Sequence, residues 1–341
     1  MSPQFTEAAG VVGPPPPFDM ELAPALVGIA SSAPPTRSAE ELTALRAQIA
    51  DAHAATDDEI RQGGRYDAVR LSAVVPEGDR EVPVLVVRPA AELGPVPLFF
   101  FIHGGGMIAG TPETDLRTIL RWADQIPSVI AAPDYGLAPE HPHPIPVEDC
   151  YSALRWVADH AEEFGVDVQR IVVCGTSAGG GLSAAITLLA RDRGFNSIFA
   201  QVLMCPMLDD RVNTVSARQM VGRGICDKIA DEALWRALLG DRRGADDVSP
   251  YAAPARAKDL SGLPPTFIDV GSAETFRDEA VMYASRIWAA GGDCELHVWA
   301  GGFHSYPSFV PTAAVSKSTE RARLEWLHRI LARAPAAKNG F

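Results

Sequence analysis

A serine flanked by glycines stands where a predicted strand meets a predicted helix. The apolar residues 171–174 run into the Gly-Thr-Ser-Ala-Gly sequence of 175–179, and a helical pattern follows from Leu182 to Arg191. A strand that turns sharply into a helix leaves the serine side chain clear of the backbone, at the carboxyl edge of a sheet. The glycines allow the strand and the helix to pack closely beside the turn. The pattern predicts a nucleophile elbow with Ser177 as the attacking group.

A serine hydroxyl is a weak nucleophile until a base takes its proton, and His304 is the predicted base. In a doubly wound hydrolase the acid and the base follow the serine in the chain, each in a loop after a strand. His304 follows the last predicted strand, 294–299, directly after two glycines. His103 precedes the elbow, which is the wrong chain order. The other six histidines fall in predicted helices, a strand or a proline-rich loop.

The acid that should orient this base has three candidates near the end of the predicted strand 266–270. Asp269 lies inside the strand. Asp278 begins a helix, where a cap on free backbone N–H groups is the simpler interpretation. Glu274 lies in the loop between them. We favour Glu274 as the triad acid and keep Asp278 as the alternative.

A glycine triplet follows the unbroken apolar strand 97–102 and forms the sequence His103-Gly104-Gly105-Gly106. Glycines let such a loop direct several backbone N–H groups at one point, as an oxyanion requires. We expect the oxyanion donors to be Gly105, Gly106 and Ala178, with His103 and Gly104 as the supporting loop. A phosphate-binding interpretation fails because no Gly-Lys-Ser/Thr follows the glycines.

The elements that must position these residues alternate between strand and helix over most of the chain, which predicts an α/β fold with a mostly parallel sheet. Two regions depart from the alternation. A helix predicted over 39–62, with a capping-box pattern at Ser38 and Glu41, precedes the first strands. The region after the strand 199–205 also breaks the pattern. The predicted domains are N-terminal cap helices at 1–75, core at 76–206, a cap insertion at 207–255 and core at 256–341.

Composition excludes several classes of protein. The 341 residues carry 30 basic and 43 acidic side chains, a net charge of −13, and no basic run, so nucleic acid is not an expected partner. The five cysteines are widely spaced, and no pair has metal-ligand spacing. Cys174 and Cys205 are interpreted as small buried hydrophobes. Free thiols, no signal peptide and no membrane span predict a cytoplasmic protein.

Taken together, the motifs resemble the hormone-sensitive-lipase-like carboxylesterases of the α/β-hydrolase fold. The resemblance covers roughly residues 80–330 and implies an eight-stranded core, a helical cap, ester hydrolysis and a homodimer. The family's acid motif begins at the position that holds Glu274, in agreement with the loop argument. The matching segments are 103–106, 134–140, 175–180, 274–279 and 302–304.

The chain departs from the family pattern at a few positions. Thr176 replaces the aspartate of the Gly-Asp-Ser-Ala-Gly motif, which assigns the chain to the Gly-Thr-Ser-Ala-Gly branch. Gly136 replaces an arginine in a segment that supports the oxyanion loop, so the rigidity of that loop is in question. Met107 replaces a frequent aromatic residue and is expected to reshape the acyl pocket. Glu274 is one methylene longer than the aspartate of the family motif.

The expected reaction is the hydrolysis of a short- to medium-chain carboxylic ester through an acyl-enzyme on Ser177. It requires no metal and no organic cofactor. An amidase or a lactonase with the same triad is the enzymatic alternative. A non-catalytic small-molecule receptor on the same fold is a further alternative, but such receptors typically lack the base, which is present here as His304.

Overall fold

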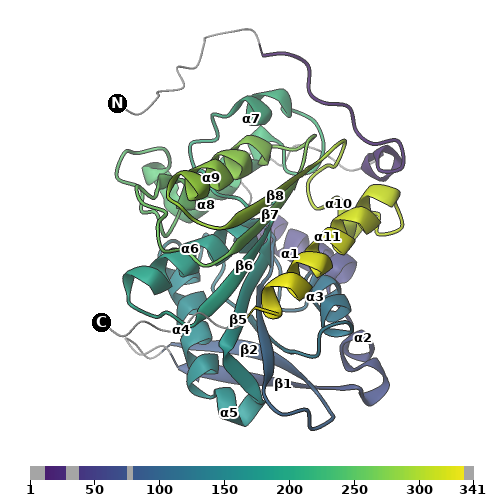
Figure 1. The fold of residues 1–341 in the computed structure, drawn as a ribbon. Coiled ribbons are helices and arrows are strands. Elements are labelled where there is room, and N and C mark those ends of the chain that lie inside the picture. The colour runs from purple at the N-terminus through teal and green to yellow at the C-terminus, as the bar shows by residue number, and fades with distance from the viewer. Residues whose placement is uncertain (1–11, 28–37, 75–79, 334–341) are drawn as a thin grey trace.

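The computed structural model describes residues 12–27, 38–74 and 80–333, which are built around an eight-stranded sheet (Figure 1). The strands lie in the order β1-β2-β4-β3-β5-β6-β7-β8. The β1–β2 and β2–β4 pairs are antiparallel, and every other pair is parallel. The predicted mostly parallel sheet is confirmed. The strands are β1 Tyr66–Val74, β2 Glu81–Pro89, β3 Val96–Ile102, β4 Val129–Pro133, β5 Val166–Thr176, β6 Ile198–Met204, β7 Thr266–Gly271 and β8 Cys294–Trp299.

Helices cover both faces of this sheet, with α4, α6 and α9 packed on one face and α3 and α11 on the other. Figure 1 shows the sheet running through the molecule between these layers. The α-helices are α1 Ala39–His53, α2 Asp57–Arg61, α3 Leu116–Ala123, α4 Ile145–Asp159, α5 Ala161–Phe164, α6 Ala178–Asp192, α7 Val215–Gln219, α8 Lys228–Leu239, α9 Arg277–Ala289, α10 Tyr306–Phe309 and α11 Ala314–Leu331. The helical layers leave the carboxyl edge of the parallel strands for the loops that carry the predicted site.

The central strand β3 shows why its sequence is apolar without interruption. Successive side chains of a strand point to opposite faces. Phe100 and Ile102 therefore pack with the α4 and α6 side, while Phe99 and Phe101 pack with the α3 and α11 side. All four side chains are completely buried. A strand buried on both faces holds the loop that follows it in a fixed position.

The N-terminal helix differs from its prediction, because the expected single helix over 39–62 is two helices. Ser38 and Glu41 form the predicted capping box at the start of α1, which ends at His53. Thr56 and Glu59 then form a second capping box that starts α2. A cap residue has an extended backbone, which interrupts a helix. The Thr-x-x-Glu pattern was the sequence signal for this break.

The region 207–255 contains α7, α8 and short 3-10 turns between its loops. Leu234 of α8 lies against the oxyanion loop, since a Cβ atom at Gly106 would meet the Leu234 side chain at 2.5 Å. The division into core and cap remains a prediction, and the parts of the N-terminal cap at 1–11, 28–37 and residue 75 lie outside the described residues. Within the described ranges, every helix is too short or too polar to cross a bilayer.

Candidate active site

Ser177 lies at the sharp turn between β5 and α6, with a backbone conformation that is rare for a residue with a side chain. Its φ and ψ angles are 58° and −121°. Its N–H donates to the carbonyl oxygen of Met204 at 2.8 Å, which fastens the turn to the end of β6. Strained backbone of this kind persists only where the surroundings enforce it, and it is concentrated at functional sites.

The flanking glycines are required by space. A Cβ atom at Gly179 would lie 2.0 Å from the carbonyl oxygen of Ile102, and one at Gly175 would lie 2.3 Å from the carbonyl oxygen of Gly179. Both contacts are with backbone, which cannot rotate away as a side chain can. The turn thus packs α6 directly against the end of β3, where the glycine-rich loop begins.

The structure brings Ser177, His304 and Glu274 into one hydrogen-bonded chain. His304 Nε2 lies 2.8 Å from Ser177 Oγ, and His304 Nδ1 lies 3.2 Å from Glu274 Oε1. The second oxygen of Glu274 accepts the N–H of Gly271 at 3.0 Å. We assign the imidazole proton to Nδ1, because a carboxylate faces that atom and Nε2 is then free to accept the serine proton.

The other two candidate acids have partners of their own. Asp269 accepts two hydrogen bonds from the Arg323 guanidinium, at 2.5 and 2.8 Å. Asp278 accepts the N–H of Ser216 at 2.7 Å and the Nε of Arg277 at 2.7 Å. Neither carboxylate faces His304 in these interactions. Asp278 instead joins the start of α9 to the start of α7.

Two opposing effects act on the His304 imidazole. Burial lowers its pKa, whereas the adjacent Cys205 and Glu274 raise it, and the net direction is well above the usual value. Burial disfavours the imidazolium, while acidic partners stabilise it. The same partners would stabilise the imidazolium that forms when His304 takes the serine proton.

The glycine-rich loop lies directly beside the serine. A Cβ atom at Gly104 would be 3.5 Å from the Cβ of Ser177. Gly105 and Gly106 have φ angles of 108° and 65°, which other residues rarely adopt. Within the described ranges the structure records no acceptor for the N–H groups of Gly105, Gly106 or Ala178. These three donors are therefore available to a negatively charged oxygen.

His103 holds the glycine-rich loop in place through its contacts with Gly104 and Tyr135 and takes no part in proton transfer. It is completely buried, its Nδ1 donates to the Gly104 carbonyl at 2.7 Å, and its ring stacks on Tyr135 at 4.3 Å. The Tyr135 hydroxyl donates to the His103 carbonyl at 3.0 Å. Burial lowers the pKa of His103 to about 4, so its ring is neutral at pH 7. The segment 134–140 thus contacts the oxyanion loop, as the sequence indicated.

Comparison with known proteins adds independent evidence. The family described as having the alpha/beta hydrolase fold matches residues 99–308. The chain belongs to this family. The solved structure titled Bacterial Heroin Esterase has a TM-score of 0.85 and 38% identity, covering 93% of this chain and 98% of that one.

Two curated relatives come from Mycobacterium tuberculosis. Carboxylesterase NlhH is 34% identical over 254 residues, which is 73% of this chain and 79% of the relative. Esterase LipI is 35% identical over 220 residues, which is 64% of this chain and 68% of the relative. The predicted fold and the resemblance to hormone-sensitive-lipase-like carboxylesterases are confirmed.

Arg46 supports the oxyanion loop of this α/β-hydrolase, a role that the sequence analysis did not predict. From α1, its Nε donates to the Ile108 carbonyl at 2.8 Å and its Nη2 to the Ala138 carbonyl at 3.2 Å. It also forms a salt bridge of 2.8 Å with Glu140. Arg46 thus joins the N-terminal helix to both loops near the site. Its contacts are 62 or more residues away in the chain, so no local pattern could reveal them.

The loop that contains Gly136 keeps polar contacts even though glycine replaces the arginine of the family pattern there. The Gly136 N–H donates to Asp149 at 2.8 Å, and Arg80 binds the same carboxylate oxygen at 2.6 Å. A Cβ atom at Gly136 would lie 2.9 Å from the His141 side chain. The segment around Gly136 is therefore held by polar contacts to Asp149 although it lacks the arginine of the family pattern.

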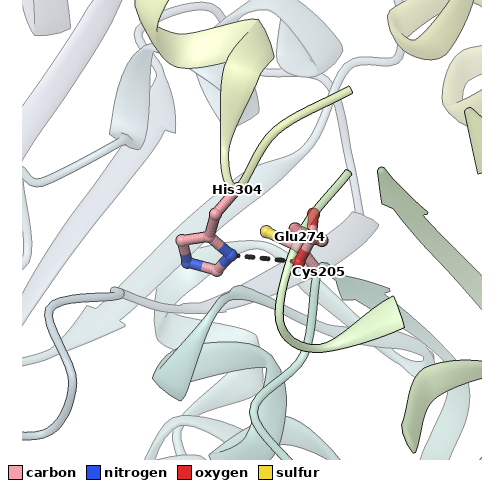
Figure 2. A group of neighbouring side chains, drawn as sticks. All are labelled: Cys205, Glu274 and His304. Carbon is pink, nitrogen blue, oxygen red and sulfur yellow. Dashed lines mark hydrogen bonds and ion pairs between the residues drawn. The ribbon is translucent and has the colours of Figure 1, made fainter. Parts of the chain in front are cut away.

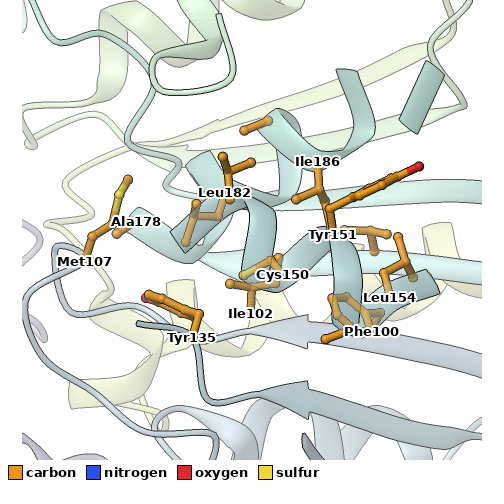
Figure 3. Close-up of a cluster of buried hydrophobic side chains, with 14 of the residues drawn as sticks. Phe100, Ile102, Met107, Tyr135, Cys150, Tyr151, Leu154, Ala178, Leu182 and Ile186 are labelled. Atoms are coloured by element: carbon orange, nitrogen blue, oxygen red, sulfur yellow. The ribbon is translucent and has the colours of Figure 1, made fainter. Parts of the chain in front are cut away.

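Met107, the other departure, is buried in the large hydrophobic cluster that also contains Ala178. Figure 3 shows both residues at one end of this cluster, with Leu182 and Ile186 farther along α6. The Met107 carbonyl accepts the N–H of Ala138 at 2.8 Å. Its thioether thus lies beside a predicted oxyanion donor, where it can influence the shape of the acyl pocket.

Cys205 lies next to the predicted triad, and its apolar sequence context gave no sign of this position. It follows β6 with a φ of 37° and is 5% exposed. Its sulfur lies 3.4 Å from the Ser305 hydroxyl. Ligand atoms of Cys205, Glu274 and His304 all lie within 4.8 Å of one another (Figure 2). The interpretation as a small buried hydrophobe describes its burial but not its neighbours.

Proposed function

We propose that the protein hydrolyses small carboxylic esters with short to medium acyl chains through an acyl-enzyme on Ser177. It is a carboxylic ester hydrolase of the α/β-hydrolase fold, and its relatives named above are esterases. One observation carries the assignment of residues: Ser177, His304 and Glu274 are linked by hydrogen bonds of 2.8 and 3.2 Å. The N–H groups of Gly105, Gly106 and Ala178, for which the described part of the chain provides no acceptor, support it.

In the first half of the reaction, Ser177 Oγ attacks the ester carbonyl while His304 Nε2 takes its proton. Negative charge develops on the carbonyl oxygen, where Gly105, Gly106 and Ala178 donate their N–H groups. Donors that are already oriented stabilise this charge without further reorganisation. Glu274 stabilises the imidazolium. His304 then protonates the departing alcohol, which leaves an acyl group on Ser177.

In the second half, a water molecule takes the place of the alcohol. His304 removes a proton from the water as it attacks the acyl-enzyme, and the same N–H groups stabilise the second oxyanion. His304 returns the proton to Ser177 Oγ, and the carboxylic acid leaves. The cycle ends with the enzyme unchanged and uses no cofactor.

A homodimer and a cytoplasmic location belong to the same proposal. The family resemblance supports the dimer. The cysteines support a reducing compartment, because all five are free. Light scattering of the purified chain at micromolar concentration tests the dimer, for which we expect twice the mass of 36.4 kDa. A mass equal to one chain would contradict it.

The first test of the proposed reaction is covalent labelling. We expect one adduct per chain after treatment with an organophosphonate that carries a p-nitrophenyl leaving group, and peptide mapping should locate it on Ser177. The Ser177→Ala variant should remain folded, take no label and lose p-nitrophenyl acetate hydrolysis. A folded wild-type chain without an adduct, or a fully active variant, would overturn the assignment. Ester, amide and lactone substrates of matched size then separate the esterase from its alternatives.

A further inference from the structure

The side chains of Cys205, Glu274 and His304 form a compact group that the proposed hydrolysis does not require as a unit. Their ligand atoms lie within 4.8 Å of one another and all three residues are buried (Figure 2). They come from the end of β6 and from the loops after β7 and β8, which are adjacent parallel strands. In the described part of the chain, this is the one such group of three side chains with ligand chemistry.

The three donor types match the preferences of one class of metal ion. Sulfur, imidazole nitrogen and carboxylate oxygen bind Zn²⁺ at about 2.3, 2.0–2.1 and 2.0–2.2 Å. A tetrahedral ion with such bonds separates its ligands by about 3.3–3.8 Å. The 3.2 Å between His304 Nδ1 and Glu274 Oε1 is close to this value. All three ligand atoms lie within 4.8 Å of one another, so the group has to contract only slightly around a bound ion. Hard cations such as Mg²⁺ prefer oxygen ligands alone.

Charge also favours a divalent ion in this buried position. A thiolate and a carboxylate contribute two negative charges, and a neutral imidazole contributes none. Adding a doubly charged cation gives a group with no net charge, and such a group avoids most of the desolvation penalty of an unpaired buried ion. Three protein ligands leave one tetrahedral position for water.

We propose that Cys205, Glu274 and His304 form an inhibitory binding site for soft divalent cations of the Zn²⁺ class. The proposal goes beyond ester hydrolysis, since it assigns a regulatory ligand to the same residues. Cys205 is the residue that creates the site, because Glu274 and His304 alone provide only two ligands.

The coordination chemistry explains why such binding stops catalysis. The metal occupies the lone pair of His304 Nδ1, so the imidazole proton moves from Nδ1 to Nε2. A protonated Nε2 donates to Ser177 and cannot accept its proton. The Cys205 thiol releases its proton to solvent as the metal–sulfur bond forms, and no group is oxidised or reduced. Removal of the metal by a chelator restores the original tautomer and the activity.

The first experiment measures Zn²⁺ inhibition of p-nitrophenyl acetate hydrolysis by the full chain. We expect inhibition that EDTA reverses. Loss of a ligand costs at least as much affinity as loss of a residue that orients one, so Cys205→Ser should raise the inhibitory Zn²⁺ concentration about 100-fold. Cys294→Ser is the matched control, because Cys294 is also a free thiol and is more exposed. Equal Zn²⁺ sensitivity of all three proteins would overturn the proposal.

A second experiment does not depend on activity. Co²⁺ is added to the Ser177→Ala variant, and the near-ultraviolet absorption of a cobalt–thiolate bond is recorded with and without the additional change Cys205→Ser. We expect the band only when Cys205 is present, with competition by Zn²⁺. An absent band, or one that persists without Cys205, would refute the site even if hydrolysis is demonstrated. An inactive wild-type protein that shows the band would instead refute the proposed hydrolysis alone.

Discussion

Replacing Glu274 with glutamine tests the proposed triad most directly. Both carboxylate oxygens accept hydrogen bonds, Oε1 from His304 Nδ1 at 3.2 Å and Oε2 from the Gly271 N–H at 3.0 Å. A glutamine amide has one acceptor oxygen and one donor NH₂ group. Whichever way it is oriented, its NH₂ group faces one of the two N–H donors. If the oxygen stays with the backbone, the NH₂ group faces Nδ1 and forces the imidazole proton onto Nε2.

The wrong tautomer leaves Ser177 without a base, while the shape of the site stays the same. We expect Glu274→Gln to lower kcat about 10³- to 10⁴-fold, because a buried acid of this type holds the catalytic tautomer. This corresponds to about 4–5.5 kcal/mol of lost transition-state stabilisation. Glu274 is 2% exposed, so it does not line the substrate pocket, and KM should stay close to that of the wild type.

The matched control is Asp278→Asn, which makes the same chemical change four residues away. Asp278 accepts hydrogen bonds from Ser216 and Arg277 and not from His304. Its replacement should leave kcat within about threefold of the wild type, as is usual for a change outside the reacting groups. Steady-state hydrolysis of p-nitrophenyl acetate measures both variants, with circular dichroism as a check on folding. A large loss in Asp278→Asn together with an active Glu274→Gln would refute the reasoning and identify Asp278 as the acid.

Three further predictions test the surrounding structure. Asp269→Asn breaks a buried ion pair and should lower the free energy of unfolding by about 3–5 kcal/mol, whereas Asp293→Asn at an exposed pair should cost less than about 1 kcal/mol in urea denaturation. Arg46→Met removes the guanidinium hydrogen bonds to the carbonyls of Ile108 and Ala138, and it should reduce kcat about 10- to 100-fold with little change in global stability. An unchanged kcat would show that the oxyanion loop is rigid without Arg46. Burial raises the pKa of Asp231, whose carboxylate oxygens have no hydrogen-bond partner among the described residues. Folding therefore takes up a proton there, and the free energy of unfolding falls as pH rises above the unfolded pKa of about 3.9. Asp231→Asn should therefore raise Tm at pH 8 more than at pH 4, and an equal shift at both pH values would contradict this.

Much of the site could be predicted from the sequence because its signals are local. The elbow around Ser177 needs two glycines and a strand-to-helix change, and all of these lie within a few residues of the serine. The oxyanion loop needs glycines directly after a buried strand. His304 is distinguished from the other histidines by chain order and by its loop. Close packing and left-handed backbone leave such traces in residue types.

The choice among the three carboxylates depended on residues far away in the chain. Asp269, Glu274 and Asp278 all lie near the end of β7, and each has the right chemistry. Arg323 of α11 binds the first, and a backbone N–H of α7 binds the third. Only Glu274 is left facing His304. Such pairings are set by the packing of distant elements, which periodicity and spacing do not record.

The sequence by itself determined the fold class, and it predicted the candidate nucleophile, the candidate base and the glycines proposed to bring backbone N–H groups to one point. The tertiary structure decided which acid faces the base, brought Arg46 to the oxyanion loop and turned Cys205 toward the triad. The physical reason is the distance along the chain over which each kind of constraint acts. Backbone conformation and strand burial constrain residue types nearby in the chain, whereas a contact between side chains depends on how separate segments pack. A cysteine in an apolar run looks the same in sequence whether its sulfur faces a core or a histidine.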